Sequence, residues 1–187
     1  MYGDRAAIAV LGPSRADAPK AGKAAELAAA LGHHLARTGY AVVVEGRGMT
    51  AQSVARSARQ VGGLVAAVTD SPDQALDVPG VEVLRTGADS VLRGGFAALS
   101  RVLELADALI LLAGDLRSVT VLTQVWVWGL EPDAPYRQIV LVGDGWPETV
   151  RILADAVGLD AKTRAMVTFA REPAEAVEAL RYYVAPR

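Results

Sequence analysis

Residues 108–129 read ALILLAGDLRSVTVLTQVWVWG. The first five are apolar, a turn follows at Ala113-Gly114-Asp115, and the remainder is almost entirely apolar. A short apolar run that ends at a glycine-containing turn is typical of a strand buried on both faces of a sheet. In open α/β sheets, ligands bind where such a strand turns into a helix, because the first N–H groups of the helix have no partner inside it. We therefore expect a ligand site at this turn.

The second half of this stretch carries two conflicting signals. Residues 119–128 are rich in β-branched and aromatic side chains, which favours a strand. Two parallel strands on either side of it need a crossover, however, and residues 113–137 are the only chain available for one. We therefore predict a helix that is apolar almost all round. Such a helix needs cover on both sides, which predicts a homodimer or a higher homo-oligomer.

Apolar runs and amphipathic segments alternate along the whole chain. Strands are expected at 6–11, 40–44, 64–68, 81–84, 108–112, 138–142 and 165–169. Helices are expected at 20–37, 50–61, 88–106, 116–129, 147–157 and 173–183, with Thr50 capping the second. This alternation predicts an α/β fold, a Rossmann-like three-layer sandwich whose mainly parallel sheet has about six to seven strands and helices on both faces. No repeat or linker divides residues 1–187, which predicts a single domain.

Composition excludes several functions. The 187 residues are 52% hydrophobic and 21% charged, which is typical of a folded chain, and the net charge of −2 argues against binding to nucleic acid or to an anionic membrane. The chain has no cysteine, and its only histidines are His33 and His34, which argues against a metal site and against a histidine-based triad. No apolar run is long enough to span a bilayer and the N-terminus has no signal-peptide pattern, so we expect a cytoplasmic protein.

Four turns should meet at the carboxyl edge of the sheet, at residues 12–15, 45–49, 113–118 and 143–146. Their glycines would let the backbone approach a ligand, their arginines supply positive charge and their serines supply hydroxyl donors, a set that suits a phosphate. The alternative is that the glycines only form tight turns, that Ser118 only caps its helix and that the arginines are solvated. The candidate ligand-binding residues are Gly12, Ser14, Arg15, Glu45, Gly46, Arg47, Gly48, Met49, Gly114, Asp115, Arg117, Ser118 and Trp146.

Aromatic and histidine side chains near these turns have different expected roles. Trp146 follows a strand at the rim of the predicted cleft, so we expect its ring to face a ligand. Packing in the core or at an interface is the expected role of Trp126, and packing beside Leu27 and Leu31 that of His34.

Several stretches, taken in order and spacing, carry a family resemblance. They are AVLGPSR at 9–15, TGYAVV at 38–43, Gly48-Met49 before a helix, GGLV at 62–65, LADALILL at 105–112, Trp128-Gly129 and EPAEAV at 172–177. The chain resembles the LOG-type, lysine-decarboxylase-like proteins, a Rossmann-like superfamily. That superfamily includes cytokinin riboside monophosphate phosphoribohydrolases and molybdenum-cofactor carrier proteins. The resemblance implies a nucleotide or a molybdopterin-type compound as the ligand.

The central turn departs from the family pattern. The family reads Pro-Gly-Gly-x-Gly-Thr-x-x-Glu, and residues 113–121 here read AGDLRSVTV, which keeps only Gly114. The family's glutamate falls on Val121, and its Arg-Lys or Arg-Asn pair falls on Ala98-Leu99. A valine can neither stabilise an oxocarbenium-like centre nor transfer a proton. We therefore expect a protein that binds a phosphorylated small molecule without the phosphoribohydrolase activity that the resemblance would otherwise imply.

Two acidic residues leave two other functions open. Glu45 and Asp115 fall where the family has glycine, and a carboxylate beside a phosphate repels it. If Arg47 and Arg117 pair with these acids and fill the pocket, the protein is a dimeric scaffold with a closed site. If the two acids work together, the protein is a hydrolase with a rebuilt site that acts on an N-glycosidic or phosphoester bond.

Overall fold

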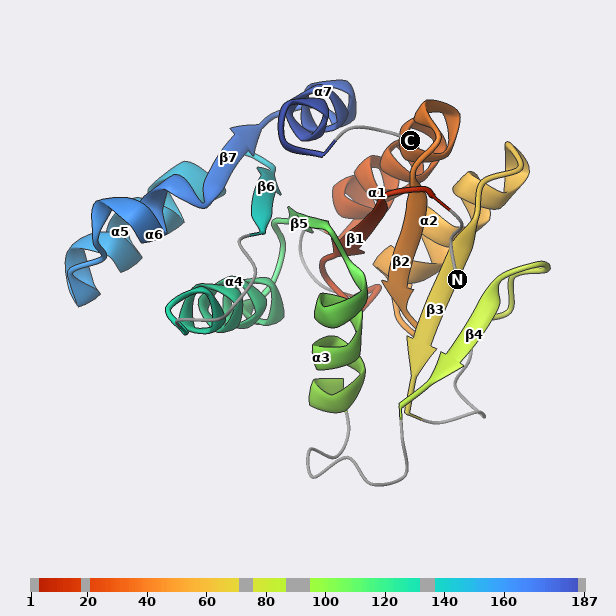
Figure 1. Ribbon diagram of the computed structural model, residues 1–187, viewed down its shortest axis with the longest axis horizontal. Coiled ribbons are helices and arrows are strands. Elements are labelled where there is room, and N and C mark those ends of the chain that lie inside the picture. The colour runs from red at the N-terminus through yellow and green to blue at the C-terminus, as the bar shows by residue number, and fades with distance from the viewer. Residues whose placement is uncertain (1–3, 18–20, 71–75, 87–94, 132–136, 185–187) are drawn as a thin grey trace.

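The computed structural model describes residues 4–17, 21–70, 76–86, 95–131 and 137–184. Within these ranges, seven parallel strands form one sheet in the order β4-β3-β2-β1-β5-β6-β7 (Figure 1). The strands are β1 (Ala7–Leu11), β2 (Ala41–Glu45), β3 (Val65–Thr69), β4 (Glu82–Arg85), β5 (Ala108–Leu112), β6 (Gln138–Val142) and β7 (Val167–Ala170). The α/β fold predicted from the sequence is thereby confirmed, and every strand of the sheet is parallel.

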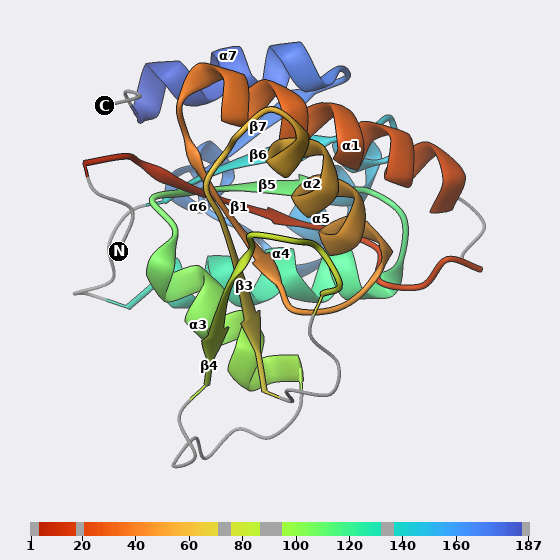
Figure 2. The same ribbon diagram turned by 90° about the vertical axis from the view of Figure 1, so that its right-hand side faces the viewer.

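Helices cover both faces of the sheet, as Figure 2 shows. One face is covered by α1 (Ala21–Thr38), α2 (Met49–Gln60) and α7 (Pro173–Tyr183). The other face is covered by α3 (Gly95–Leu105), α4 (Leu116–Gly129), α5 (Trp146–Val157) and the short α6 (Ala161–Ala165). Successive residues of β1 point to opposite faces: Ile8 and Val10 join the first core and Ala9 and Leu11 the second. The five inner strands are buried along their whole length, whereas the edge strands β4 and β7 are partly exposed.

The order of the strands places the site. From β1 the chain moves outward through β2 and β3 to β4, then returns to pair β5 with the free side of β1. The direction of winding therefore reverses between β1 and β5, whose register runs from Ile8 opposite Ala108 to Leu11 opposite Leu111. In open α/β sheets, ligands bind at the carboxyl ends of the strands beside such a reversal. The turns after β1 and β5 are the two that flank it.

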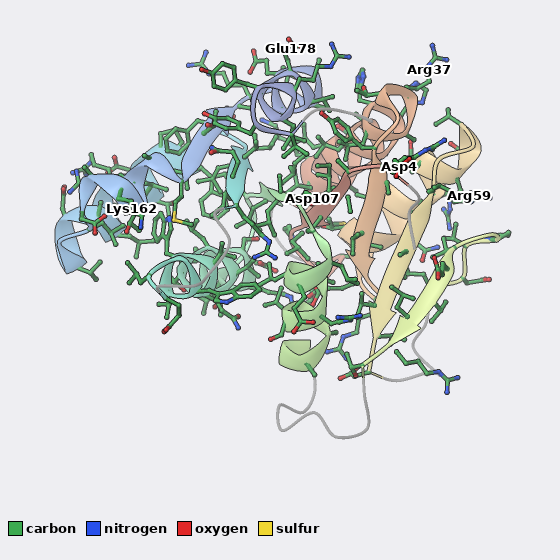
Figure 3. The ribbon with its side chains drawn as sticks, viewed as in Figure 1. Asp4, Arg37, Arg59, Asp107, Lys162 and Glu178 are labelled. Atoms are coloured by element: carbon green, nitrogen blue, oxygen red, sulfur yellow. The ribbon has the colours of Figure 1, made fainter. Side chains whose placement is uncertain are left out.

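At the opposite, amino edge the sheet is fixed by Asp107, whose carboxylate accepts a hydrogen bond from the backbone N–H of Ala7 at 2.8 Å. Asp107 lies near the middle of the molecule in Figure 3. Arg37, Arg59 and Glu178 lie at the rim of the same view. A hydrogen bond between a side chain and the backbone therefore links the starts of β5 and β1 at the amino edge.

The start of α2 differs from the start predicted from the sequence. The conflicting stretch is a helix, α4, as the crossover argument predicts. The prediction that Thr50 caps α2 is wrong: Gly48 is the cap residue, with φ 95°, and Thr50 lies inside the helix with its hydroxyl donating to the carbonyl of Pro13 at 2.7 Å. Glycine tolerates this positive φ without strain, so α2 begins one residue earlier than predicted. Helix α6 was not predicted, and residues 88–94 of the predicted third helix lie outside the described residues.

Candidate functional site

The four turns meet at the carboxyl edge of the sheet and lie in a row. Turn 12–15 lies between turn 45–49 and turn 113–118, since the N–H of Met49 donates to the carbonyl of Ser14 at 3.0 Å. On its other side, a Cβ on Gly114 would lie 2.2 Å from Cγ of Pro13. Turn 143–146 continues the row, because a Cβ on Gly143 would lie 3.0 Å from Cβ of Ala113. That these turns bind a ligand stays a prediction.

Packing between chain segments explains most of the glycines. A Cβ at position 12 would lie 2.9 Å from Cβ of Leu112, and one at position 46 would lie 2.5 Å from Cβ of Thr69. At position 48 it would lie 3.1 Å from Ser14, in addition to the positive φ. These glycines therefore let the turns pack closely against neighbouring strands and turns, whereas the sequence suggested that they leave room for a ligand.

The start of α4 already holds a carboxylate. Asp115 is the N-cap residue, and its Oδ1 accepts hydrogen bonds from the backbone N–H of Ser118 at 3.0 Å and from its hydroxyl at 3.2 Å. A carboxylate at this position is favoured both by the free N–H groups and by the helix dipole. The capping role is therefore the reverse of the one expected: Asp115 caps and Ser118, which is buried, donates.

A second carboxylate is paired with Arg117. Glu45 ends β2, and its Oε1 accepts a hydrogen bond from Nη2 of Arg117, which lies in the first turn of α4. The side chain of Glu45 is 9% exposed and that of Arg117 is 31% exposed. Because β1 lies between β2 and β5, this ion pair spans the turn after β1. Of the two arginines expected to meet an acid here, the structure brings Arg117 onto Glu45.

Burial dominates the electrostatics of Glu45. It raises the pKa of the carboxyl above its ordinary value, and the positive charge of Arg117, the hydrogen bond from Arg117 and the charge of Arg47 oppose it without cancelling it. Asp70, which follows β3, adds to the upward shift of the pKa. The carboxylate form of Glu45 is therefore less favoured here than in water, although a cation is bound to it.

Of the remaining predicted residues, Arg15 is exposed and pairs with Asp17, its Nε donating to Oδ1 at 2.8 Å. Trp146 is not at a rim. It is 2% exposed, and its ring N–H donates to the carbonyl of Leu111 at 3.0 Å. The expectation that Trp146 faces a ligand is therefore wrong, because the first turn of α5 directs the ring into the core. Trp126 is buried, as expected.

Two cavities of very different volume lie near the two ends of the row of four turns. A cavity of only about 10 Å³ lies between turns 12–15 and 45–49. A cavity of about 190 Å³ lies at the other end, between the start of α1 and turn 143–145. Its lining is Lys23, Ala24, Leu27, Ala113, Val142, Gly143, Asp144 and Gly145, and Nζ of Lys23 lies 3.1 Å from Oδ2 of Asp144.

Lys23 was missed by the sequence reasoning. It lies in the first turn of α1, the helix that follows turn 12–15, and a cation at that place is the signal that could have indicated it. The sequence alone does not show that α1 leans toward turn 143–145.

No acid replaces the family's glutamate on α4. Val121 is 4% exposed and packs in the core between α4 and the sheet. Residues 116–129 contain neither aspartate nor glutamate. A group that could stabilise an oxocarbenium-like centre or transfer a proton is therefore absent from this helix.

The described residues show neither a metal-binding cluster nor a membrane-spanning helix. Among the residues that the structure describes, no three acidic or histidine side chains come together as metal ligands would. Across those ranges, no helix has both the length and the apolar character needed to cross a membrane.

These features define a class: an all-parallel Rossmann-like α/β protein whose candidate site lies at the turn after β5. Neither a protein-family model nor a curated protein sequence matches the chain. Solved structures do match. The chain superimposes on the Moco carrier protein of Chlamydomonas reinhardtii with a TM-score of 0.69 and 22% identity, covering 95% of this chain and 96% of that one.

Two further structures agree. The molybdenum cofactor binding protein of the bacterium Rippkaea orientalis gives a TM-score of 0.70 at 17% identity, over 97% of this chain and 98% of that one. A structural-genomics target called TM1055 gives a TM-score of 0.72 at 19% identity, over 95% of this chain and 99% of that one. The chain therefore has the fold of these proteins, and the fold expected from the family resemblance is confirmed.

Proposed function

We propose that the protein binds a phosphorylated small molecule of the nucleotide or pterin class at the carboxyl edge of its sheet and leaves that molecule intact. The observation that carries the proposal is the replacement of the family's acid by the buried Val121, on a helix without any acidic residue. The names of two proteins with the same fold, a carrier and a binding protein for molybdenum cofactor, support a binding role.

The proposed ligand-binding site is the cavity beside turn 143–145. Its walls combine small and apolar residues with the exposed Lys23–Asp144 ion pair, which suits a flat or sugar-like group with polar substituents at one end. Ala113 lines the cavity and begins the turn that leads to Arg117. A ligand seated there can extend its phosphate toward the start of α4.

The hydrolase alternative is not favoured, because both of its acids are engaged. Asp115 accepts two hydrogen bonds from Ser118, and Glu45 is paired with Arg117. The closed-scaffold alternative is favoured by that same Glu45–Arg117 pair. It differs from our proposal in one measurable respect, which is whether any small molecule binds.

We also propose that two copies of the chain pair through α4. The side chains on its outer face lie at helical spacing and are Leu116, Thr120, Thr123, Val127 and Leu130; we call this set the α4 stripe. Leu116, Val127 and Leu130 are 80%, 62% and 61% exposed, so these three side chains are not covered by the residues that the structure describes. The hydroxyls of Thr120 and Thr123 donate to the carbonyls of Leu116 and Thr120 in the same helix, so neither needs a hydrogen-bond acceptor from outside it.

The α4 stripe suits a copy of itself. Run in opposite directions about a two-fold axis at Thr123, two stripes place Leu116 against Leu130 and Thr120 against Val127. Continuous exposed apolar surface of this kind marks an interface.

A thermal-shift panel tests the binding proposal. Adenosine and guanosine monophosphates and a pterin phosphate are added to the wild type, to Lys23→Ala and to a matched control, Lys162→Ala on the distant α6. A ligand present at about 100 times its Kd adds about 2.7 kcal/mol, a rise in Tm of about 5–10 °C. We expect this rise for the wild type and the control and a smaller one for Lys23→Ala. No shift with any compound would contradict the proposal and favour the closed scaffold.

A further inference from the structure

Arg117 and Glu45 hold each other at the place where the ligand's phosphate is expected, and the inference below rests on the proposed function. Arg117 lies in the first turn of α4, directly after the turn that follows β5. Its Nη2 donates to Glu45, a residue 72 positions earlier in the chain. A guanidinium that is half-buried and already bound to a carboxylate cannot pair fully with a phosphate until that carboxylate leaves.

The charges around the pair make the carboxylate replaceable. Glu45 is buried at the end of a central strand, and Arg117 on α4, Arg47 on its own turn and Asp70 after β3 are the charged groups that influence it. Burial and Asp70 raise the pKa of Glu45, and the two arginines lower it by less. Removing Arg117 from this balance would raise the pKa of Glu45 further, because the strongest opposing influence would be lost.

Other charged groups that the structure describes at this edge are already engaged. Asp115 already caps α4 through Ser118, and Arg15 is paired with Asp17 on the exposed side of the turn. The cavity beside Glu45, between turns 12–15 and 45–49, is only about 10 Å³. A carboxylate released from Arg117 therefore stays buried, with the charges of Arg47 and Asp70 still acting on it in opposite directions. Since Arg117 makes the largest contribution that opposes burial, its loss favours uptake of a proton by Glu45.

We propose that the Glu45 carboxylate is an internal substitute for the anionic group of the ligand, which displaces it from Arg117 on binding. One proton enters from solvent as the exchange occurs and protonates Glu45. By linkage, the affinity for a doubly charged anion then falls as the pH rises, by up to tenfold per pH unit, wherever Glu45 is ionised in the free protein. Glu45 thus sets both the affinity of the site for anions and its response to pH.

Sulfate is a suitable probe because its charge does not change across the relevant range of pH. Its affinity for the full chain is measured by calorimetry between about pH 6 and about pH 8 for the wild type and for Glu45→Gln. We expect wild-type affinity to fall steeply with rising pH. Glu45→Gln should bind sulfate at least about tenfold more tightly at the upper pH, and its affinity should not depend on pH. Equal affinity of the two proteins, or an equal pH dependence, would overturn the inference.

Two control variants separate the exchange from general charge effects. Glu104→Gln removes an exposed carboxylate that also pairs with an arginine, Arg101, and should behave as the wild type. Arg117→Gln should abolish the sulfate binding of both the wild type and Glu45→Gln. If sulfate still binds without Arg117, the exchange on that residue is refuted.

A measurement without any variant keeps the inference testable if Glu45→Gln does not fold. The carboxyl carbon of Glu45 is titrated by NMR in the wild type, with and without saturating sulfate. The pKa of Glu45 should rise when sulfate binds, and an unchanged pKa would refute the exchange. Failure of the proposed function would give a different result. The affinity for sulfate would then depend on Glu45 and on pH as expected, but no nucleotide or pterin phosphate would bind.

Discussion

Gly114 lies directly against Pro13: a Cβ at position 114 would stand 2.2 Å from Cγ of the proline ring. The two residues belong to the turns after β5 and β1, which flank the reversal in strand order. Their contact fixes the distance between these turns, and the start of α4 and the Glu45–Arg117 pair depend on it.

Replacing Gly114 by alanine should therefore destabilise the protein. The added methyl group meets a rigid ring, so one of the two turns must move, at a cost of about 1–3 kcal/mol in the free energy of unfolding. Gly145→Ala is the matched control on the same edge, since no atom lies within 4 Å of its Cβ position and its φ is −79°. Urea denaturation compares the two, and a Gly114→Ala protein as stable as the control would show that the turns are not locked together.

Two glycines of α1 allow a similar comparison within one helix. A Cβ on Gly32 would lie 2.3 Å from the backbone carbonyl oxygen of Val54 in α2, whereas Gly22 has open space. Gly32→Ala should separate the two helices and cost about 1–3 kcal/mol, and Gly22→Ala should stabilise by up to about 1 kcal/mol through helix propensity. Thermal unfolding followed by circular dichroism measures both. Equal changes in Tm would mean that α1 does not pack on α2 through Gly32.

The ring N–H of Trp146 should matter for stability and not for the ligand. Trp146→Phe leaves the carbonyl of Leu111 without this donor in the core, which costs about 1–3 kcal/mol. Affinity for a nucleotide or for sulfate should stay as in the wild type. Normal stability with impaired binding would return Trp146 to the ligand site.

The fold could be predicted because apolar runs indicate buried strands and the glycine-containing turns indicate where those strands end. The stretch 119–128 shows the limit of local propensity: its β-branched residues favour a strand, but parallel neighbours require a crossover, and a helix forms. Thr50 shows the limit of capping rules, since the positive φ of Gly48 starts α2 earlier and frees the hydroxyl for Pro13.

The site was harder to predict because it depends on directions that only packing sets. The four turns could be identified from the order of strands and helices. The sequence left open whether Glu45 pairs with an arginine or works together with Asp115. The position of α4 places Arg117 against the Glu45 carboxylate, so the structure has the ion pair. Lys23 was missed and Trp146 was misplaced because the directions of helices α1 and α5 are set by packing. The tilt of α1 brings Lys23 toward the cavity, and the direction in which α5 begins turns Trp146 into the core.

A single charge on the α4 stripe should abolish pairing between copies. Val127→Glu places a carboxylate at an apolar position that is 62% exposed in the single chain, and burying it in an interface would be strongly unfavourable. Ile152→Glu is the control, because Ile152 is 52% exposed on α5, outside the stripe. In sedimentation velocity we expect dimers for the wild type and for Ile152→Glu and monomers for Val127→Glu. A wild type that sediments as a monomer would contradict the pairing.

The central claim is that this protein holds a phosphorylated small molecule without breaking it. The most direct test incubates the purified wild type with adenosine monophosphate, separates bound from free compound by equilibrium dialysis, and analyses both fractions by chromatography. Binding with recovery of intact adenosine monophosphate is the predicted result. Accumulation of free adenine and ribose 5-phosphate at an enzyme-like rate, about 1 per second or faster, would contradict the account.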